Sequence, residues 1–275
     1  MNPLLSINPS TGLKIRSYNQ HNDVEIDNIL NSSYEAQKKW QNTDLKFRLT
    51  CLEQLSEVLS DSKREYSLLM AEEMGKPFKQ GIGEIEKCIW LCNYYKENSE
   101  IYLDDKKIKT DGQKSFVIFK PLGLILGIMP WNFPFWQVFR FAVPSIIAGN
   151  GAILKHASNV QGCAFSIESS FSKSGFPKHL FQNISISGKN VSEVIKLAKN
   201  INCHHFVLPF VDSSKIKNEK ELNDLMQLIS SVIPILESNQ IELHIESDLG
   251  PSEFAHLLDN INHELVGINY DSGNS

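Results

Sequence analysis

The residues of this 275-residue chain that are best placed for chemistry lie where an apolar segment meets an asparagine between two prolines. Residues 124–129 are largely aliphatic and predict a buried strand, which stops at Pro130. Pro130 and Pro134 restrict the backbone on either side of Asn132. Because parallel sheets bind ligands beyond the carboxyl ends of their strands, this amide is suited to donate a hydrogen bond into a cleft. The alternative is structural, since asparagine is also a favoured cap for a helix that begins at Phe133.

A second group of polar residues lies near the end of the chain. In the strand predicted over 241–246, alternation puts His244 and Glu246 on one face, and Asp271 follows the strand predicted over 265–270. Carboxylates at strand ends are ligands that divalent metals prefer. Two carboxylates alone hold Mg²⁺ or Mn²⁺ weakly, so the residue count favours a pair of strand-end acids without a metal.

The five cysteines, an odd number without CxxC spacing, predict reduced thiols. Cys88 and Cys92 lie one helical turn apart, which is compatible with a metal or redox site. No histidine or further cysteine nearby completes such a site, so the spacing favours two thiols that face a core.

Composition and charge point to a small-molecule protein. With 41% hydrophobic residues, 21% charged residues and a net charge of −5, the chain is typical of a globular α/β protein. This charge gives no reason to expect nucleic acid or a membrane surface as a partner. The start of the chain has no basic region followed by an apolar run, and no apolar run is long enough to span a bilayer, so we expect a cytoplasmic location.

The elements that must position these residues follow from periodicity. Helical spacing predicts four helices, capped at Asn22 or Asp23 and at Asp44, over 24–40, 45–59, 65–74 and 82–95. Residues 101–121 predict a hairpin, of a kind that often serves subunit contact, with its turn at Asp111 and Gly112. Strands and helices then alternate as in a doubly wound parallel sheet, over 124–129, 135–148, 152–155, 160–174 and 181–184. The same alternation continues over 205–210, 219–236, 241–246, 252–258 and 265–270.

Residues 1 to about 195 resemble the aldehyde dehydrogenase superfamily and, within it, the succinate-semialdehyde dehydrogenases. The pair Lys155-His156, where most members have Lys-Pro, resembles the succinate-semialdehyde branch. The shared motifs are Ile7-Asn8-Pro9-Ser10-Thr11-Gly12, Glu73-Met74-Gly75-Lys76-Pro77, Lys120-Pro121-Leu122-Gly123, Ile128-Met129-Pro130-Trp131-Asn132-Phe133-Pro134, Ala148-Gly149-Asn150-Gly151 and Leu154-Lys155-His156-Ala157.

The resemblance implies a chemistry and assigns residues to it. The family oxidises an aldehyde through a cysteine nucleophile, a glutamate base and NAD or NADP. Asn132 matches the side-chain donor to the oxyanion, Met129, Pro130 and Trp131 match backbone that lines the cofactor cleft, and Lys155 matches the residue that reaches the adenosine ribose. Without the resemblance, Lys155 is equally a solvated lysine at a strand end.

Past residue 195 the resemblance changes. The family's Thr-Gly-Ser turn, glutamate and cysteine motifs do not follow, so we expect neither Cys163 nor Cys203 to be the nucleophile and the chain to be inactive as a dehydrogenase. Residues 196–275 resemble instead the xylose-isomerase-like sugar-phosphate isomerases, in which Glu246 and Asp271 match metal ligands. The expected fold is therefore α/β: a helical region, a hairpin and a partial Rossmann-like sheet over 1–195, then about three strand-helix units of a β/α barrel over 196–275.

Three functions remain open: a truncated dehydrogenase, a fragment of a metal-dependent isomerase, and a non-catalytic fusion. The missing nucleophile favours the third for present activity. Because cut sheets leave apolar edges, we also expect marginal stability and self-association.

Overall fold

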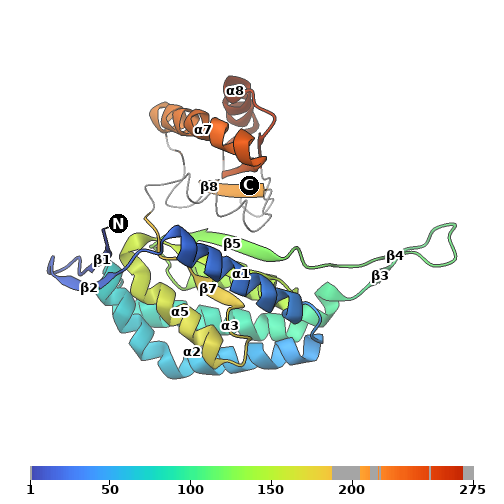
Figure 1. Cartoon of the computed structure of the whole chain (residues 1–275), viewed down its shortest axis with the longest axis horizontal. Helices are drawn as coiled ribbons and strands as arrows, with labels where there is room; N and C mark the ends of the chain where they lie inside the picture. The colour runs from blue at the N-terminus through green and yellow to red at the C-terminus, as the bar shows by residue number, and fades with distance from the viewer. Residues whose placement is uncertain (1, 188–204, 211–215, 217, 248, 269–275) are drawn as a thin grey trace. The chain divides into compact units, whose positions relative to one another are not determined.

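The computed structural model describes residues 2–187, 205–210, 216, 218–247 and 249–268. They belong to two compact units, unit 1 (Met1–Gly188) and unit 2 (Lys189–Ser275), coloured blue to yellow and orange to red in Figure 1. The domain boundary predicted near residue 195 stays a prediction.

Three long helices open unit 1 after a short ribbon. They are α1 (Asp23–Trp40), α2 (Leu45–Met74) and α3 (Phe78–Leu103). The predicted caps at Asn22 and Asp44 are confirmed, since each side chain accepts a backbone N–H three residues on. Gly75 ends α2 with φ of 75°, which glycine adopts without strain. None of the described helices combines the length and apolar character needed to cross a bilayer.

Two of these boundaries correct the prediction. Residues 45–59 and 65–74 form one helix, because the residues between them include no glycine or proline to interrupt it. The helix α3 continues to Leu103, so the start of the predicted hairpin is helical.

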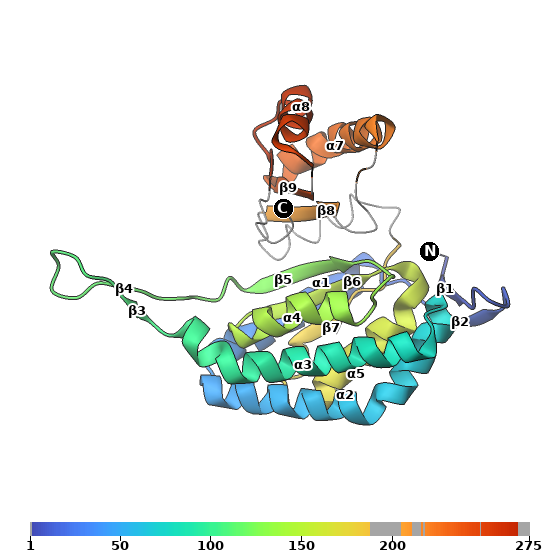
Figure 2. The same cartoon turned by 180° about the vertical axis from the view of Figure 1, so that it is seen from behind.

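The hairpin itself is a narrow ribbon of β3 (Lys106–Lys107) and β4 (Phe116–Val117), paired antiparallel. It extends as a long arm away from the helices of unit 1 in Figures 1 and 2. Its apolar side chains Ile108, Phe116, Val117, Ile118 and Phe119 are exposed.

A second ribbon, β1 (Leu4–Ile7) with β2 (Lys14–Tyr18), was not predicted. Every residue of β2 up to Ser17 is exposed, so the strand lacks the alternation of apolar and polar residues that marks a half-buried strand. Its turn is local, because Asn8 accepts the N–H groups of Ser10 and Thr11.

The predicted parallel sheet of unit 1 is confirmed. It consists of β5 (Leu124–Met129), β6 (Gly151–His156) and β7 (Phe181–Asn183), in that order, connected by α4 (Trp136–Ile147) and by η1 (Ser158–Val160) with α5 (Gln161–Lys173).

The sheet is covered on both faces. Figure 1 is viewed from the side of α1 and Figure 2 from the side of α4. The helix α1 packs on one face, since a Cβ added at Gly151 would lie 3.3 Å from Gln37 of α1. The helix α4 packs on the other face, since a Cβ added at Gly127 would lie 2.4 Å from Phe141 of α4. The helices α2 and α3 form a further layer on α4 and α5. All six residues of β6 are therefore buried.

Unit 2 repeats the connection on a smaller scale. The strands β8 (His205–Phe210), β9 (Glu242–Ser247) and β10 (Val266–Ile268) are parallel and adjacent in sequence order, with α7 (Glu219–Asn239) and α8 (Pro251–Ile261) between them. Apolar residues of both helices pack with Leu243, Ile245 and Val266. Doubly wound sheets and β/α barrels both contain this arrangement, so the predicted barrel fragment stays a prediction.

Candidate functional site

Asn132 and Lys155 lie at the carboxyl ends of the neighbouring strands β5 and β6. In the strand register Ile128 is paired with Lys155 and Met129 with His156, so the loop 130–134 leaves β5 beside the end of β6. Met129 is half-buried, Pro130 is exposed and Trp131 is 51% exposed. Asn132 therefore follows β5, and Lys155 lies near the end of β6, at the same edge of the sheet.

The side chain of Asn132 is half-buried, and its Oδ1 accepts the N–H of Phe133 at 3.1 Å. This contact fixes which way the amide group faces. The helix α4 begins only at Trp136, with Phe135 as its N-cap residue and no side-chain cap of its own. The interpretation of Asn132 as a helix cap is therefore wrong.

The cap of α4 comes from a distant carboxylate. Glu84 of α3 is buried, and its Oε1 accepts the N–H groups of Phe135 at 2.8 Å and Trp136 at 2.9 Å. A negative charge at a helix N-terminus is favourable, because the unpaired N–H groups there carry partial positive charge. Glu84 also forms a buried ion pair with Lys76, whose Nζ lies 4.0 Å from the centre of the Phe133 ring. Both residues thus anchor the loop that carries Asn132.

His156 holds the same loop from the sheet. Its Nε2 lies 2.9 Å from the carbonyl oxygen of Pro134, and its Nδ1 accepts the N–H of Ala157 at 2.9 Å. Burial lowers the pKa of this imidazole to about 4, and nearby Lys155 also lowers it, while the carbonyls of Pro134 and Met129 act in the opposite sense. Nδ1 also lies 3.2 Å from the carbonyl oxygen of Met129. Because the shorter contact of Nδ1 is with a donor, Ala157 N–H, we assign the proton of the neutral ring to Nε2, which then donates to Pro134.

Lys155 points to the other face of β6. Because side chains alternate along a strand, Lys155 lies on the same face as Ile153, which is the face that packs against α1. This lysine is only 6% exposed. Burial lowers the pKa of its ammonium, and within the described residues that ammonium makes no hydrogen bond or ion pair. A solvated strand-end lysine does not fit these observations. A buried ammonium of this kind is suited to hydroxyl or anionic groups of a ligand.

The other candidate residues do not join this site. Cys88 and Cys92 are buried as predicted for core thiols, and burial raises the pKa of each. Cys163 is fully buried, and burial together with the Glu73 carboxylate raises the pKa of its thiol well above the usual range. Cys203 lies outside the described residues.

The predicted metal ligands belong to unit 2. Glu246 belongs to β9, but its side chain is not described, and Asp271 lies outside the described residues. His244, on the same strand, contacts Glu242 at 3.0 Å. No group of three possible metal ligands occurs in the described part of the chain.

A second buried carboxylate repeats the role of Glu84. Glu73 of α2 accepts the N–H groups of Gly162 and Cys163, each at 2.9 Å, at the start of α5. A Cβ at position 162 would lie 2.7 Å from Glu73 Oε1, so only glycine gives the carboxylate this access. Sequence reasoning missed both carboxylates. The available signal was a glutamate inside an otherwise apolar helical stripe, as at Glu84 between Gly81 and Cys88.

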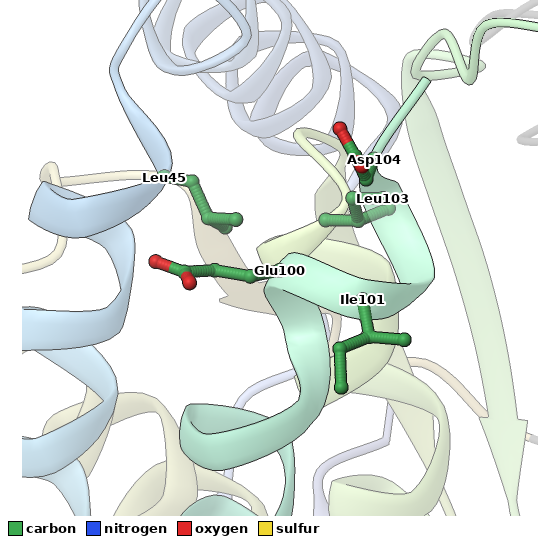
Figure 3. Close-up of a pocket in the computed structure, with 5 residues that line it drawn as sticks. All are labelled: Leu45, Glu100, Ile101, Leu103 and Asp104. Atoms are coloured by element: carbon green, nitrogen blue, oxygen red, sulfur yellow. The ribbon is translucent and has the colours of Figure 1, made fainter. Parts of the chain in front are cut away.

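A hollow of the described surface lies elsewhere. Figure 3 shows it near the end of α3, with a volume of about 500 Å³ and a lining of Leu45, Glu100, Ile101, Leu103 and Asp104. None of the candidate residues lines it, so it is not the site described above.

Comparison with known proteins agrees with this geometry. A probable NADP-dependent succinate-semialdehyde dehydrogenase of Synechocystis is 41% identical over 192 residues, and the enzyme Sad of Escherichia coli, a succinate semialdehyde dehydrogenase that uses NAD or NADP, is 36% identical. Each match covers 70% of this chain and 42% of the relative, so the chain spans less than half the length of either.

The fold has similar solved examples. The crystal structure of a succinic semialdehyde dehydrogenase from Streptococcus pyogenes, in complex with NADP⁺, matches with a TM-score of 0.74 and 25% identity, over 89% of this chain and 50% of that one. The model of the aldehyde dehydrogenase family matches residues 2–207. This chain therefore belongs to the aldehyde dehydrogenase family.

Proposed function

We propose that this chain supplies part of the cofactor site and the oxyanion donor of an NAD(P)-dependent succinate-semialdehyde dehydrogenase. The observation that supports this most is the placement of Asn132 and Lys155 at the carboxyl ends of the adjacent parallel strands β5 and β6. Asn132 donates to the oxygen of the aldehyde as negative charge develops there, a contact worth about 3 kcal/mol. The backbone of Met129, Pro130 and Trp131 lines the cleft.

The proposed cofactor site fits a dinucleotide. The buried ammonium of Lys155, which has no partner among the described residues, is suited to the ribose hydroxyls of the adenosine half. When bound, the nicotinamide would accept the hydride removed from the aldehyde carbon. Succinate semialdehyde as substrate, and NADP beside NAD, are supported by the names of the two relatives and of the similar crystal structure.

We further propose that residues 1–275 alone do not oxidise the aldehyde. The four described cysteines are buried, which disfavours the thiolate that attack on a carbonyl needs. A non-catalytic fusion therefore remains the alternative for present activity. The isomerase alternative for residues 196–275 rests on the sequence resemblance at Glu246 and Asp271.

Isothermal titration with NADP⁺ and NAD⁺ tests the cofactor proposal. We expect measurable binding of at least one of them, weakened about tenfold or more by Lys155→Ala through loss of the ribose contacts. Lys173→Ala, at the end of α5, is the matched control and leaves binding unchanged. Absence of binding, or equal effects of both variants, would reject the proposed role of Lys155.

We also propose that the chain self-associates through the apolar arm of β3 and β4. Exposed aromatic and aliphatic side chains on a short two-stranded ribbon favour pairing with another chain. Sedimentation velocity should show oligomers that Phe116→Lys with Val117→Lys converts to monomer. A monomer in the unmodified protein would contradict this.

A further inference from the structure

The imidazole ring of His156 connects the end of β6 to the loop that carries Asn132. At the end of the loop, Nε2 of His156 contacts the carbonyl oxygen of Pro134. At the start of the loop, the N–H of Ala157 donates both to Nδ1 of His156 and to the carbonyl oxygen of Met129. The ring has no exposed surface. Its two nitrogens therefore contact backbone rather than solvent.

The loop depends on such outside contacts. Two of the five residues in 130–134 are prolines and have no N–H, so the loop has few backbone donors with which to fix itself. Glu84 holds the segment that follows, at Phe135 and Trp136. Within the described residues, His156 is the side chain of the sheet that reaches the carbonyl of Pro134.

We propose that His156 is a positioning residue for Asn132: its Nε2–H bond to Pro134 fixes the loop so that the Asn132 amide keeps one orientation. The role of Asn132 as oxyanion donor rests on the proposed function, but the placement of the loop does not. Phenylalanine at position 156 would keep a ring and lose both nitrogens. Glutamine would keep a donor at about the distance of Nε2.

The first test uses the unmodified protein without nucleotide. Nitrogen-15 NMR of the His156 imidazole should show Nε2 protonated and Nδ1 unprotonated at pH 7. The opposite tautomer, or a charged ring at this pH, would overturn the proposal. This measurement does not depend on whether any variant folds.

The second test follows the amide hydrogen exchange of Phe133, whose N–H is bonded to Asn132 Oδ1 and so reports the orientation of that side chain. His156→Phe should speed this exchange about tenfold or more, and His156→Gln should restore it to within about threefold. His21→Phe is the matched control, because His21 accepts the N–H of Ser185 elsewhere in unit 1, and it should leave Phe133 unchanged.

Unchanged exchange in His156→Phe, or no restoration by glutamine, would overturn the proposal, since the ring would then act by shape alone. If the dinucleotide fails to bind while these exchange rates behave as expected, the proposed function fails and the positioning role stands.

Discussion

The two parallel sheets of this chain share a connection but differ in how they are covered. Among the described residues of each sheet, three strands lie in sequence order and two α-helices connect them. In unit 1 the central strand β6 is buried at all six positions, because α1 covers the face that α4 and α5 leave open. In unit 2 the central strand β9 alternates, with Leu243 and Ile245 buried and Glu242 and His244 half-buried.

This difference shows what a β-α-β-α-β unit supplies by itself. Its own helices cover one face, and burial of the second face requires a helix from outside the repeat. Unit 1 has that helix and also the buried carboxylates Glu73 and Glu84, which cap α5 and α4 from the outer helical layer. One of these outside contacts, from Glu84 to Phe135 and Trp136, holds the segment that follows the loop of Asn132.

The largest change in stability should come from a substitution in the outer helical layer of unit 1. Glu84→Gln leaves Lys76 buried without its charge partner, and we expect it to lower the free energy of unfolding by about 4–5 kcal/mol. All four tryptophans lie in unit 1, so their fluorescence in urea follows this unit alone. Glu86→Gln, in an exposed pair with Lys63, should change it by less than about 1 kcal/mol. Equal effects would mean that the buried pair does not hold the layer.

The second prediction compares the face of β6 that α1 covers with the half-buried face of β9. Ile153→Ala opens a cavity between β6 and α1 and should destabilise unit 1 by about 3–4 kcal/mol. His244→Ala on the half-buried face of β9 should change unit 2 by less than about 1 kcal/mol. Amide exchange of each unit measures both. A large effect at His244 would show that its face is packed as tightly as that of β6.

The third prediction concerns pH. Since the pKa of His156 is lowered to about 4, the folded state favours the neutral ring, and this stabilisation is lost as pH falls from 6.5 through 4. Burial raises the pKa of Glu168 to about 7, and its contribution changes in the opposite direction, being lost as pH rises through 7. In a Glu168→Gln background, unit 1 should therefore lose about 2–3 kcal/mol between pH 7 and pH 4.5 through His156.

Adding His156→Phe to that background should abolish this part of the loss, as seen in urea midpoints at both pH values. A loss of the same size in the double variant would assign it to other groups.

The smallest expected effect tests whether local rules are the same in both units. Asn22 caps α1 and Asn218 caps α7, each by accepting an N–H three residues on. Replacing either with alanine should cost about 1 kcal/mol in its own unit. Amide exchange in the first turn of each helix provides the measurement. Clearly unequal losses would show that tertiary contacts, rather than the cap, hold one of these ends.

Elements with a clear period were predictable from the sequence. Six predicted strands, including 124–129 and 205–210, are present, and two N-caps were located because the capping residue and the N–H group from which it accepts are close in sequence. The strands β1 and β2 were missed because they lack alternation, and the join inside α2 was missed because polar residues there resembled a break.

The candidate site was predictable only in part. Asn132 and Lys155 could be predicted as site residues because each lies at a strand end, which is a local signal. The residues that hold the loop of Asn132 could not be predicted, because Glu84 lies 51 residues before its partner Phe135 and His156 lies 22 residues after its partner Pro134. Contacts across such separations depend on how helices pack, which periodicity does not encode.

The access that Gly162 gives to Glu73 links two positions far apart in the chain. Any single-base change of a glycine codon that alters the residue adds a Cβ, and here it would push against a buried carboxylate. We therefore expect a lineage to vary position 162 more readily after position 73 has changed to a smaller residue. In a library that randomises both, alanine at 162 should survive selection for folding together with a shortened residue 73 and not with glutamate, so the two sites would evolve in a fixed order.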